Sequence, residues 1–334
     1  METKRNVILK EVLYMGVVAA VIFSLRWLMP FIGGYPELAT RILIFGILVL
    51  GFDILVGLTG YLSFGHAAFW GVGAYVCGYV LLHYTQNVLV AMLVGVVVVT
   101  LIALLLGVIT LRRHGIYFAI LTLAFAEMFY YLALTPLQTW TGGDNGLTGI
   151  RTPQLFGLEL SGYTMYLFVG IWTLLAVYTA RRIKRSPYGL MLRAIKANET
   201  RLTYTGVDVF RYKVMAFVIS GMFGGLAGTL LAAYETYVPT ESLHWTLSGE
   251  IVIMAVIGGF GTLVGPMIGA GIVLYLENVL SAITEQWHLI LGLIFMGFVI
   301  FLPGGVMDVP RRLRRLARGG TRTSPAPREQ QAGD

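Results

Sequence analysis

RRIKRSPYGLMLRAIKANETRLTYTGVDVFRYK (Arg181–Lys213) is a polar segment with a long apolar segment on each side. It is rich in Lys and Arg, and a basic segment between two membrane spans is expected to face the cytoplasm. Ser186 and Pro187 form a helix-start signal, and Gly206 is a glycine of the kind that ends helices. We therefore predict one short cytoplasmic helix over 187–206.

That helix is predicted to be amphipathic. Its apolar stripe contains Tyr188, Met191, Leu192, Ile195 and Leu202, and the opposite face contains Arg193, Lys196 and Thr200. Such a stripe suits docking to a soluble partner. The alternative is an ordinary cytoplasmic loop that lies on lipid headgroups.

The composition places the whole chain in a membrane. Of its 334 residues, 57% are hydrophobic and 12% are charged, whereas a soluble domain carries about 25% charged residues. The net charge of +7 comes from loops between apolar segments and from the tail, so it does not indicate a nucleic-acid partner. The single cysteine, Cys77, excludes an intrachain disulfide and a thiol–metal cluster. We expect membrane lipid around the chain and no metal site.

We predict an all-α polytopic protein with about ten transmembrane segments, since a span needs about 20 apolar residues. The predicted spans are 7–29, 38–58, 63–83, 88–110, 116–134, 164–182, 213–233, 248–263, 266–283 and 286–303. The first is read as a retained span and not as a signal peptide. With both termini in the cytoplasm, every Lys and Arg except Arg26, Arg41 and Arg151 lies on the inner side.

Two glycine-rich stretches make the second and third segments, and the eighth and ninth, candidates for bent or re-entrant helices. In GLTGYLSFGHAAFWGVGAY (57–75), Ser63 is a candidate N-cap for a half-helix whose N–H groups would face an anion. Tight packing without a ligand is the alternative, and His66 is more simply explained as a buried, hydrogen-bonded histidine. The second stretch is IGGFGTLVGPMIGAG (257–271).

Two further patterns concern helix packing and symmetry. Gly221, Gly224, Gly225 and Gly228 form two overlapping GxxxG pairs, which predict close helix crossings. GLTGYL (57–62) and GLAGTL (225–230) hint at an inverted repeat of two five-span halves.

Charged residues inside apolar spans leave a second class of transporter as an alternative. Asp53, Glu127 and Glu277 each need a partner, a wet cavity or a proton, because a charge at the bilayer centre costs about 2.5–3.5 kcal/mol. They are the features that would support a proton- or sodium-coupled secondary carrier.

Four motifs, in this order, resemble the LivM-type permease of bacterial branched-chain amino-acid ABC importers. They are GYLSFGHAAFWGVGAY, TGGDNGLTGI, the segment from Ser186 to Leu230, and GGFGTLVGPMIGA. The resemblance runs from about residue 40 to 308. It implies a multi-pass permease of the bacterial inner membrane that pairs with a LivH-type permease, two cytoplasmic ATP-binding subunits and a periplasmic substrate-binding protein.

By this resemblance, the residues that couple the permease to the ATPases are Arg193, Ala194, Asn198, Glu199 and Gly206. The chain has no GxxxxGK[ST] motif, so we expect no cofactor here, no ATPase activity, and ATP and Mg bound by the partners. The segment Arg201–Thr205 departs from the alanine-rich family pattern, which leaves urea, amides or small carboxylates as alternative substrates.

A zwitterion with an apolar side chain needs small polar groups along its path. The residues predicted to line that path are Ser63, Gly65, His66, Phe69, Gly258, Gly259, Gly261 and Gly265. The substrate-binding protein is expected to dock on the outer segments Gly142–Gly149 and Glu235–Glu241. We expect one transmembrane domain over 1–308 with a coupling loop at 184–212, and a basic helix and disordered tail over 309–334.

Overall fold

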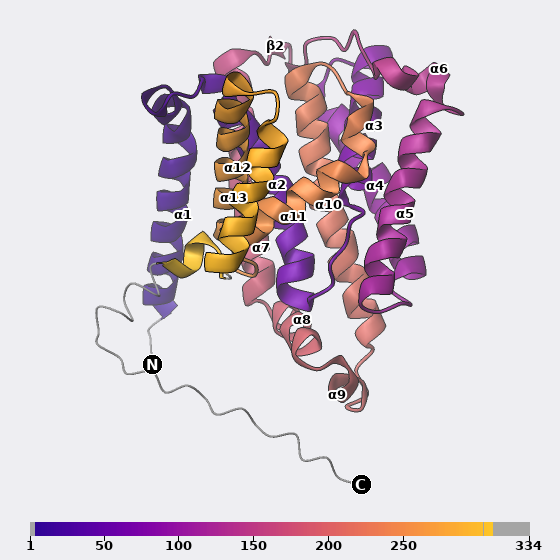
Figure 1. Ribbon diagram of the computed structural model, residues 1–334, viewed down its shortest axis with the longest axis vertical. Helices are drawn as coiled ribbons and strands as arrows, with labels where there is room; N and C mark the ends of the chain where they lie inside the picture. The colour runs from indigo at the N-terminus through magenta and orange to yellow at the C-terminus, as the bar shows by residue number, and fades with distance from the viewer. Residues whose placement is uncertain (1–3, 303, 310–334) are drawn as a thin grey trace.

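The computed structural model describes residues 4–302 and 304–309, and within them the chain is a bundle of ten apolar helices (Figure 1). The ten are α1 (Lys4–Leu28), α2 (Pro36–Thr59), α3 (His66–His83), α4 (Val88–Thr110), α5 (Ile116–Leu134), α7 (Gly162–Arg185), α10 (Val209–Glu235), α11 (Trp245–Gly258), α12 (Val264–Ile283) and α13 (Trp287–Phe301). All except α3 and α11 belong to segments that are long and apolar enough to cross a membrane, and for α13 that segment extends to Asp308. The prediction of an all-α polytopic chain is confirmed, and eight of the ten predicted segments meet the length and composition of a membrane span in the described residues.

The two ends of the bundle carry different short elements (Figure 1). One end carries α8 (Pro187–Ala197) and α9 (Glu199–Thr203), and we call it the basic end. The other, the hairpin end, carries α6 (Gln138–Thr141) and the antiparallel strands β1 (Gln154–Leu155) and β2 (Leu158–Glu159). Four short 3-10 turns complete the described elements: η1 (Met29–Ile32), η2 (Gly143–Asn145), η3 (Thr240–Leu243) and η4 (Val306–Asp308). The predicted tail helix lies beyond the described residues.

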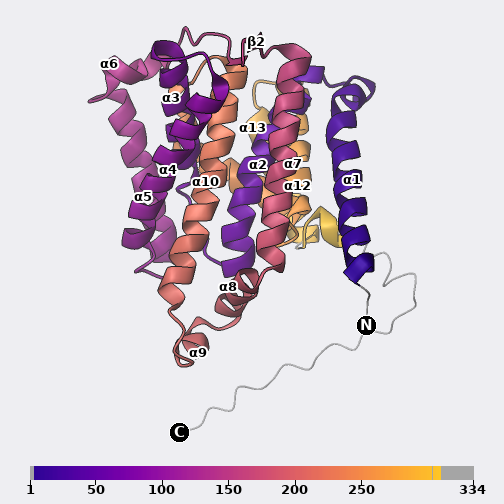
Figure 2. The same cartoon turned by 180° about the vertical axis from the view of Figure 1, so that it is seen from behind.

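α2 is the centre of the bundle. Every residue from Leu38 to Thr59 is buried except Arg41. α7, α10 and α12 pack around it, and Figure 2 shows α2 between α7 and α10. α1 stands at one edge, where Glu11 pairs with Arg181 at 2.7 Å and with Arg185. A helix buried all round is expected to be apolar on every face, which is the composition of α2.

Glycines bring α10 close to two helices at once. A Cβ at Gly221 or Gly225 would lie 2.7–2.8 Å from Ala103 or Val99 of α4. A Cβ at Gly228 would overlap the Trp70 carbonyl oxygen of α3, and Gly224 lies against Phe69. Helices in lipid gain little from the hydrophobic effect, so close backbone approach of this kind is a main source of their association. The Gly221/Gly225 pair therefore packs against α4, and the Gly224/Gly228 pair packs against α3.

The two glycine-rich stretches are both places where the helical path is interrupted. Gly60–Gly65 separates α2 from α3, and Gly259–Leu263 separates the 14-residue α11 from α12. α11 crosses the middle of the bundle (Figure 1), so the eighth predicted span is a short internal helix. GLTGYL covers the end of α2, whereas GLAGTL lies inside α10, so these two segments have different structures and give the repeat no support.

Candidate functional site

The segment at the basic end is two helices and not one. Ser186 Oγ accepts the Gly189 N–H at 3.2 Å, and Pro187 starts α8 as predicted. At Asn198 the backbone becomes extended (φ −165°), and its side-chain oxygen accepts the Arg201 N–H at 2.8 Å to begin α9. The prediction of one helix over 187–206 is therefore wrong, because an asparagine that caps a new helix interrupts the old one.

The apolar stripe of α8 is used inside the molecule. Leu192 and Ile195 are buried, and α8 packs against α2, α7 and α10. Tyr188 stacks on Tyr212, with ring centroids 5.8 Å apart, and donates a hydrogen bond to its carbonyl at 3.0 Å. The stripe is thus not free to dock a soluble partner or to lie on lipid headgroups. The exposed face of this segment carries other residues, including Leu190, Arg193 and Tyr204.

The side chains of Tyr61, His114 and Lys213, from three other parts of the chain, meet at Glu199. We call these four residues the Glu199 cluster. Glu199 of α9 accepts hydrogen bonds from Tyr61 (2.6 Å) and Lys213 (2.7 Å). Lys213 Nζ also lies 3.0 Å from the Tyr61 hydroxyl, and His114 Nδ1 lies 2.7 Å from it. Because the Tyr61 proton goes to Glu199, the His114 nitrogen is the donor to Tyr61. The cluster ties α9 to the α2–α3 connection, the α4–α5 turn and the start of α10.

The contacts of Glu199 favour its ionised form. Partial burial alone would raise the pKa of Glu199, but hydrogen bonds from Lys213 and Tyr61 and the charge of Lys213 outweigh it and lower the pKa. Burial and the neighbouring Glu199 raise the pKa of Tyr61, so its hydroxyl stays protonated. The cluster is therefore a charged pair with a neutral tyrosine between its members.

A second set of contacts at this end holds the α11–α12 loop. Asp53 of α2 accepts the N–H groups of Gly261 (2.6 Å) and Leu263 (3.1 Å), and Leu263 has a positive φ of 69°. Lys196 of α8 donates to the Gly57 carbonyl at 2.9 Å, and Lys184 donates to the Gly261 carbonyl. The buried aspartate therefore positions a loop, and two lysines link that loop and the end of α2 to α7 and α8.

The predicted path residues near α3 are inside the protein. Ser63, His66 and Phe69 are almost fully buried. His66 Nε2 lies 2.7 Å from Ser220 Oγ, which donates to the Gly51 carbonyl, so His66 is the buried hydrogen-bonded histidine that the sequence favoured. Ser63 does not cap α3, because its oxygen accepts the Gly65 N–H instead.

The N–H groups at the start of α3 are partly used within the protein. The Ala67 N–H is bonded to Ser248 Oγ of α11 at 3.0 Å, which uses one of the donors that an anion would need. Gly258 ends α11, Gly259 and Gly261 lie in the α11–α12 connection, and Gly265 lies in the first turn of α12. A Cβ at Gly258 would overlap the Gly265 carbonyl oxygen. None of the eight predicted path residues lines either of the two cavities described next, and their role in transport stays a prediction.

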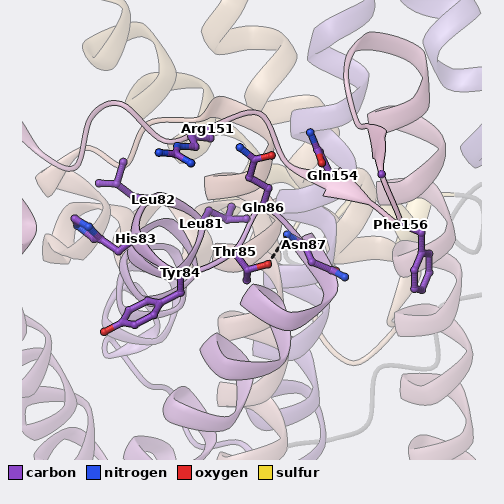
Figure 3. A pocket seen from close by; sticks show the side chains of 11 residues that line it. Leu81, Leu82, His83, Tyr84, Thr85, Gln86, Asn87, Arg151, Gln154 and Phe156 are labelled. Atoms are coloured by element: carbon purple, nitrogen blue, oxygen red, sulfur yellow. Dashed lines mark hydrogen bonds between the residues drawn. The ribbon is translucent and has the colours of Figure 1, made fainter.

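Two cavities open away from the basic end. The larger, about 380 Å³, lies between the α3–α4 connection and the β1–β2 hairpin (Figure 3). Gln86, Asn87, Arg151 and Gln154 line it, and the Gln154 N–H donates to the Gln86 carbonyl at 2.7 Å. The smaller, about 200 Å³, is lined by Arg41 and four glutamates of which Glu277 is one. We call it the Arg41 cavity.

The remaining charged residue in a span and the predicted outer segments also have partners. Glu127 of α5 accepts the Trp245 N–H at the start of α11 at 3.2 Å. The predicted outer segments Gly142–Gly149 and Glu235–Glu241 meet at the hairpin end, where Leu147 and Val238 pair as an antiparallel bridge.

Sequence reasoning missed Tyr61, His114 and the Arg41 cavity. Tyr61 and Glu199 are 138 residues apart, and no local pattern relates them. For the cavity, Arg41 itself is the available sequence signal, because it is a charged residue inside a predicted span.

Comparison with known proteins identifies the family. The model of the family described as "Branched-chain amino acid transport system / permease component" matches residues 35–302. The high-affinity branched-chain amino acid transport system permease protein LivM of Salmonella typhimurium is 28% identical over 325 residues, 90% of this chain and 76% of the relative. LivM of Escherichia coli K12 is 28% identical over 91% of this chain and 77% of its own length.

A more distant relative aligns with part of the chain. The ribose import permease RbsC of Haemophilus influenzae is 28% identical over 43% of this chain and 47% of its own length. No solved structure matches. With a family model that covers most of its length, this chain belongs to the branched-chain amino acid transport system permease component family.

Proposed function

We propose that this chain is a permease subunit of an ABC importer that moves branched-chain or other hydrophobic amino acids across the bacterial inner membrane. The observation that carries the proposal is the family match over residues 35–302. In this assignment the basic end faces the cytoplasm, both termini lie on that side, and the hairpin end faces the periplasm. The positive-inside distribution of Lys and Arg supports this orientation.

The partners in this proposal are a LivH-type permease, two ATP-binding subunits that hold ATP and Mg, and a periplasmic substrate-binding protein. The ATP-binding subunits dock on the exposed face of α8 and α9, where Arg193 and Tyr204 are accessible. The binding protein docks at the hairpin end, where the outer segments 142–149 and 235–241 lie together.

The mechanism is alternating access driven from the basic end. Nucleotide-dependent movement of the ATP-binding subunits displaces α8 and α9. The Glu199 cluster passes this displacement to α10 and to the α2–α3 and α4–α5 connections. Lys184 and Lys196 pass it to the α11–α12 loop and to the end of α2. Helices that meet through glycine contacts then move as rigid bodies, because packed interfaces shift between discrete arrangements.

The experiment is uptake of radiolabelled leucine by a strain that lacks this gene, with and without the gene restored. Restored uptake should collapse when ATP is depleted and persist when a protonophore removes the proton gradient while ATP is kept constant. Uptake that follows the proton gradient and ignores ATP would instead assign the chain to the secondary carriers. Normal uptake of another class of solute, without uptake of leucine, would reject the assignment of a hydrophobic amino acid as the substrate.

A further inference from the structure

The Arg41 cavity gathers charged groups from several helices at membrane depth. Arg41 comes from α2, Glu235 from α10, Glu250 from α11 and Glu277 from α12, with Glu241 of η3 at the exposed rim. Arg41 lies five residues inside α2 and Glu277 six residues inside α12, which places both about 8–9 Å from the helix ends nearest the hairpin. The cavity is thus lined mainly by helices, together with Pro239, Glu241 and Ser242 of the α10–α11 connection.

The charges in this cavity are not balanced by the chain itself. One guanidinium faces four carboxylates. Arg41 Nε lies 3.3 Å from Glu235 Oε1, but the geometry leaves this buried nitrogen without a hydrogen bond within the described part of the chain. Because charges within a bilayer cost several kcal/mol unless they are solvated or paired, the surface cannot face lipid tails. It must face water, hold protons on part of its carboxyl groups, or face a solute or partner that supplies positive charge.

The wall beside these charges is apolar. Phe45, Trp70, Leu231 and Leu274 line the cavity and are themselves buried, and the Phe45 and Trp70 rings lie 4.8 Å apart. At about 200 Å³ the space is smaller than the roughly 300–1,000 Å³ of pockets for drug-sized ligands. The cavity therefore offers an anion site, several cation sites and an apolar surface to one small molecule.

We propose that the Arg41 cavity is a substrate site on the translocation path and that it binds a small zwitterionic amino acid with an aliphatic side chain. The Arg41 guanidinium binds the α-carboxylate, Glu250 and Glu277 bind the ammonium group, and the Phe45–Trp70 wall contacts the side chain. Glu235 holds Arg41 in place. This assignment rests on the proposed function, since it names where the transported solute contacts this subunit.

The test uses a single cysteine in the complete importer in membrane vesicles. Thr246 lines the cavity, is exposed and carries no charge, so Thr246→Cys reports on access without removing a charged group. The native Cys77 is fully buried and gives little background. A charged, membrane-impermeant methanethiosulfonate is added from the side of the hairpin end. Leu93→Cys, on the exposed surface of α4, is the matched control for lipid-facing positions.

We expect the reagent to label Thr246→Cys and to leave Leu93→Cys unlabelled. Leucine should slow the labelling by about tenfold at a concentration about ten times its Kd, since the unoccupied fraction of sites falls as 1/(1 + [L]/Kd). 4-Methylpentanoate, which lacks the ammonium, and isoamylamine, which lacks the carboxylate, should protect much less. Adding Glu250→Gln or Arg41→Gln should remove protection by leucine while labelling continues, which separates loss of binding from loss of folding.

Three outcomes would overturn this inference: no labelling of Thr246→Cys, labelling that leucine does not slow, or full protection in the Glu250→Gln background. Its failure is distinct from failure of the proposed function. Normal ATP-dependent leucine uptake without protection rejects the cavity as the site. Absence of leucine uptake by the unmodified importer rejects the proposed function itself.

Discussion

The Glu199 cluster and the Arg41 cavity are both built from charged side chains at places where helices meet, but their charges are arranged differently. Around Glu199 one carboxylate meets one ammonium, and the tyrosine hydroxyl lies between them within hydrogen-bond distance of both. In the Arg41 cavity four carboxylates meet one guanidinium whose Nε has no hydrogen bond within the described chain. A complete set of partners fixes a position, whereas an incomplete set is an arrangement that a ligand can complete.

One helix connects the two regions. α10 begins near Lys213 in the Glu199 cluster and ends at Glu235 in the Arg41 cavity, which is about 33 Å along its axis. Between these ends its glycines lie against α3 and α4. A displacement of Lys213 can therefore reach the cavity through α10.

The largest effect is expected from reversing the charge at Glu199. Glu199→Lys would place a second positive charge next to that of Lys213, whose side chain is only 4% exposed. Breaking a buried ion pair costs about 3–5 kcal/mol, and the 26% exposure of Glu199 places this pair at the lower end. We expect the chain to insert normally and leucine uptake to fall at least about tenfold relative to ATP hydrolysis, since about 1.4 kcal/mol already corresponds to tenfold.

The double variant Glu199→Lys with Lys213→Glu distinguishes pairing from the identity of either residue. It restores opposite charges and should recover part of the uptake. Glu159→Lys, on the exposed hairpin strand β2, is the control and should leave uptake unchanged. Unimpaired coupling in Glu199→Lys would remove the cluster from the transmission path.

A smaller effect is expected from crowding the helix between the two regions. Gly225→Leu would place its Cβ 2.8 Å from the Val99 Cβ, so α10 and α4 must separate. Overpacking of this kind costs about 1–3 kcal/mol and should lower the melting temperature of the assembled importer. Gly297→Leu on α13, where a Cβ would have no neighbouring atom within 4 Å in the described chain, should leave it unchanged. Equal melting temperatures for both variants would contradict the packing role.

Removing one hydroxyl should weaken the cluster without destroying it. Tyr61→Phe deletes the hydrogen bond to Glu199 but keeps the Lys213–Glu199 pair. A hydrogen bond to a charged group contributes about 1.5–3 kcal/mol, so we expect a partial loss of coupling, smaller than in Glu199→Lys. The ratio of leucine transported to ATP hydrolysed measures it. Tyr117→Phe, an exposed tyrosine of α5, provides the comparison, and equal ratios in the two variants would count against the cluster.

The smallest effect is expected from pH. Because the folded protein lowers the pKa of Glu199, the stabilisation from its charged form is complete above the pKa of the unfolded chain. It is lost only as the pH falls through the still lower folded value. The difference in coupling between the unmodified importer and Glu199→Gln should therefore stay constant from pH 7 to about pH 5, since an unperturbed Glu titrates near about 4.3. Convergence of the two within that range would contradict the ion-pair assignment.

Hydropathy predicts the ten apolar helices of this fold, because the length and composition of each apolar run determine whether it can cross a bilayer. It does not predict that α3 and α11 fall short of a full span. The break at Asn198 was not predicted, since the apolar spacing continues through it while the backbone turns to cap a new helix. The buried stripe of α8 shows the same limit, because amphipathicity predicts that a face is covered and not what covers it.

The candidate sites were harder to predict than the fold for a related reason. The residues proposed for coupling include Glu199, but its partners Tyr61 and Lys213 come from distant segments that only the folded chain brings together. Ser63 and His66 are polar residues in an apolar run, and each has a hydrogen-bond partner inside the protein through Ser63 Oγ and His66 Nε2. Arg41 is the more informative residue, since it is the one residue between Leu38 and Thr59 that is not buried, and it lines a cavity.

We propose that this chain is a gate moved from its basic end by the ATP hydrolysis of partner subunits. Leucine accumulation in proteoliposomes tests it most directly, with the chain alone compared with the chain assembled with its permease partner, ATP-binding subunits and binding protein. The account predicts accumulation only in the complete assembly and only with ATP inside the compartment that faces α8 and α9. Accumulation by the chain alone, powered by a proton or sodium gradient, would contradict it.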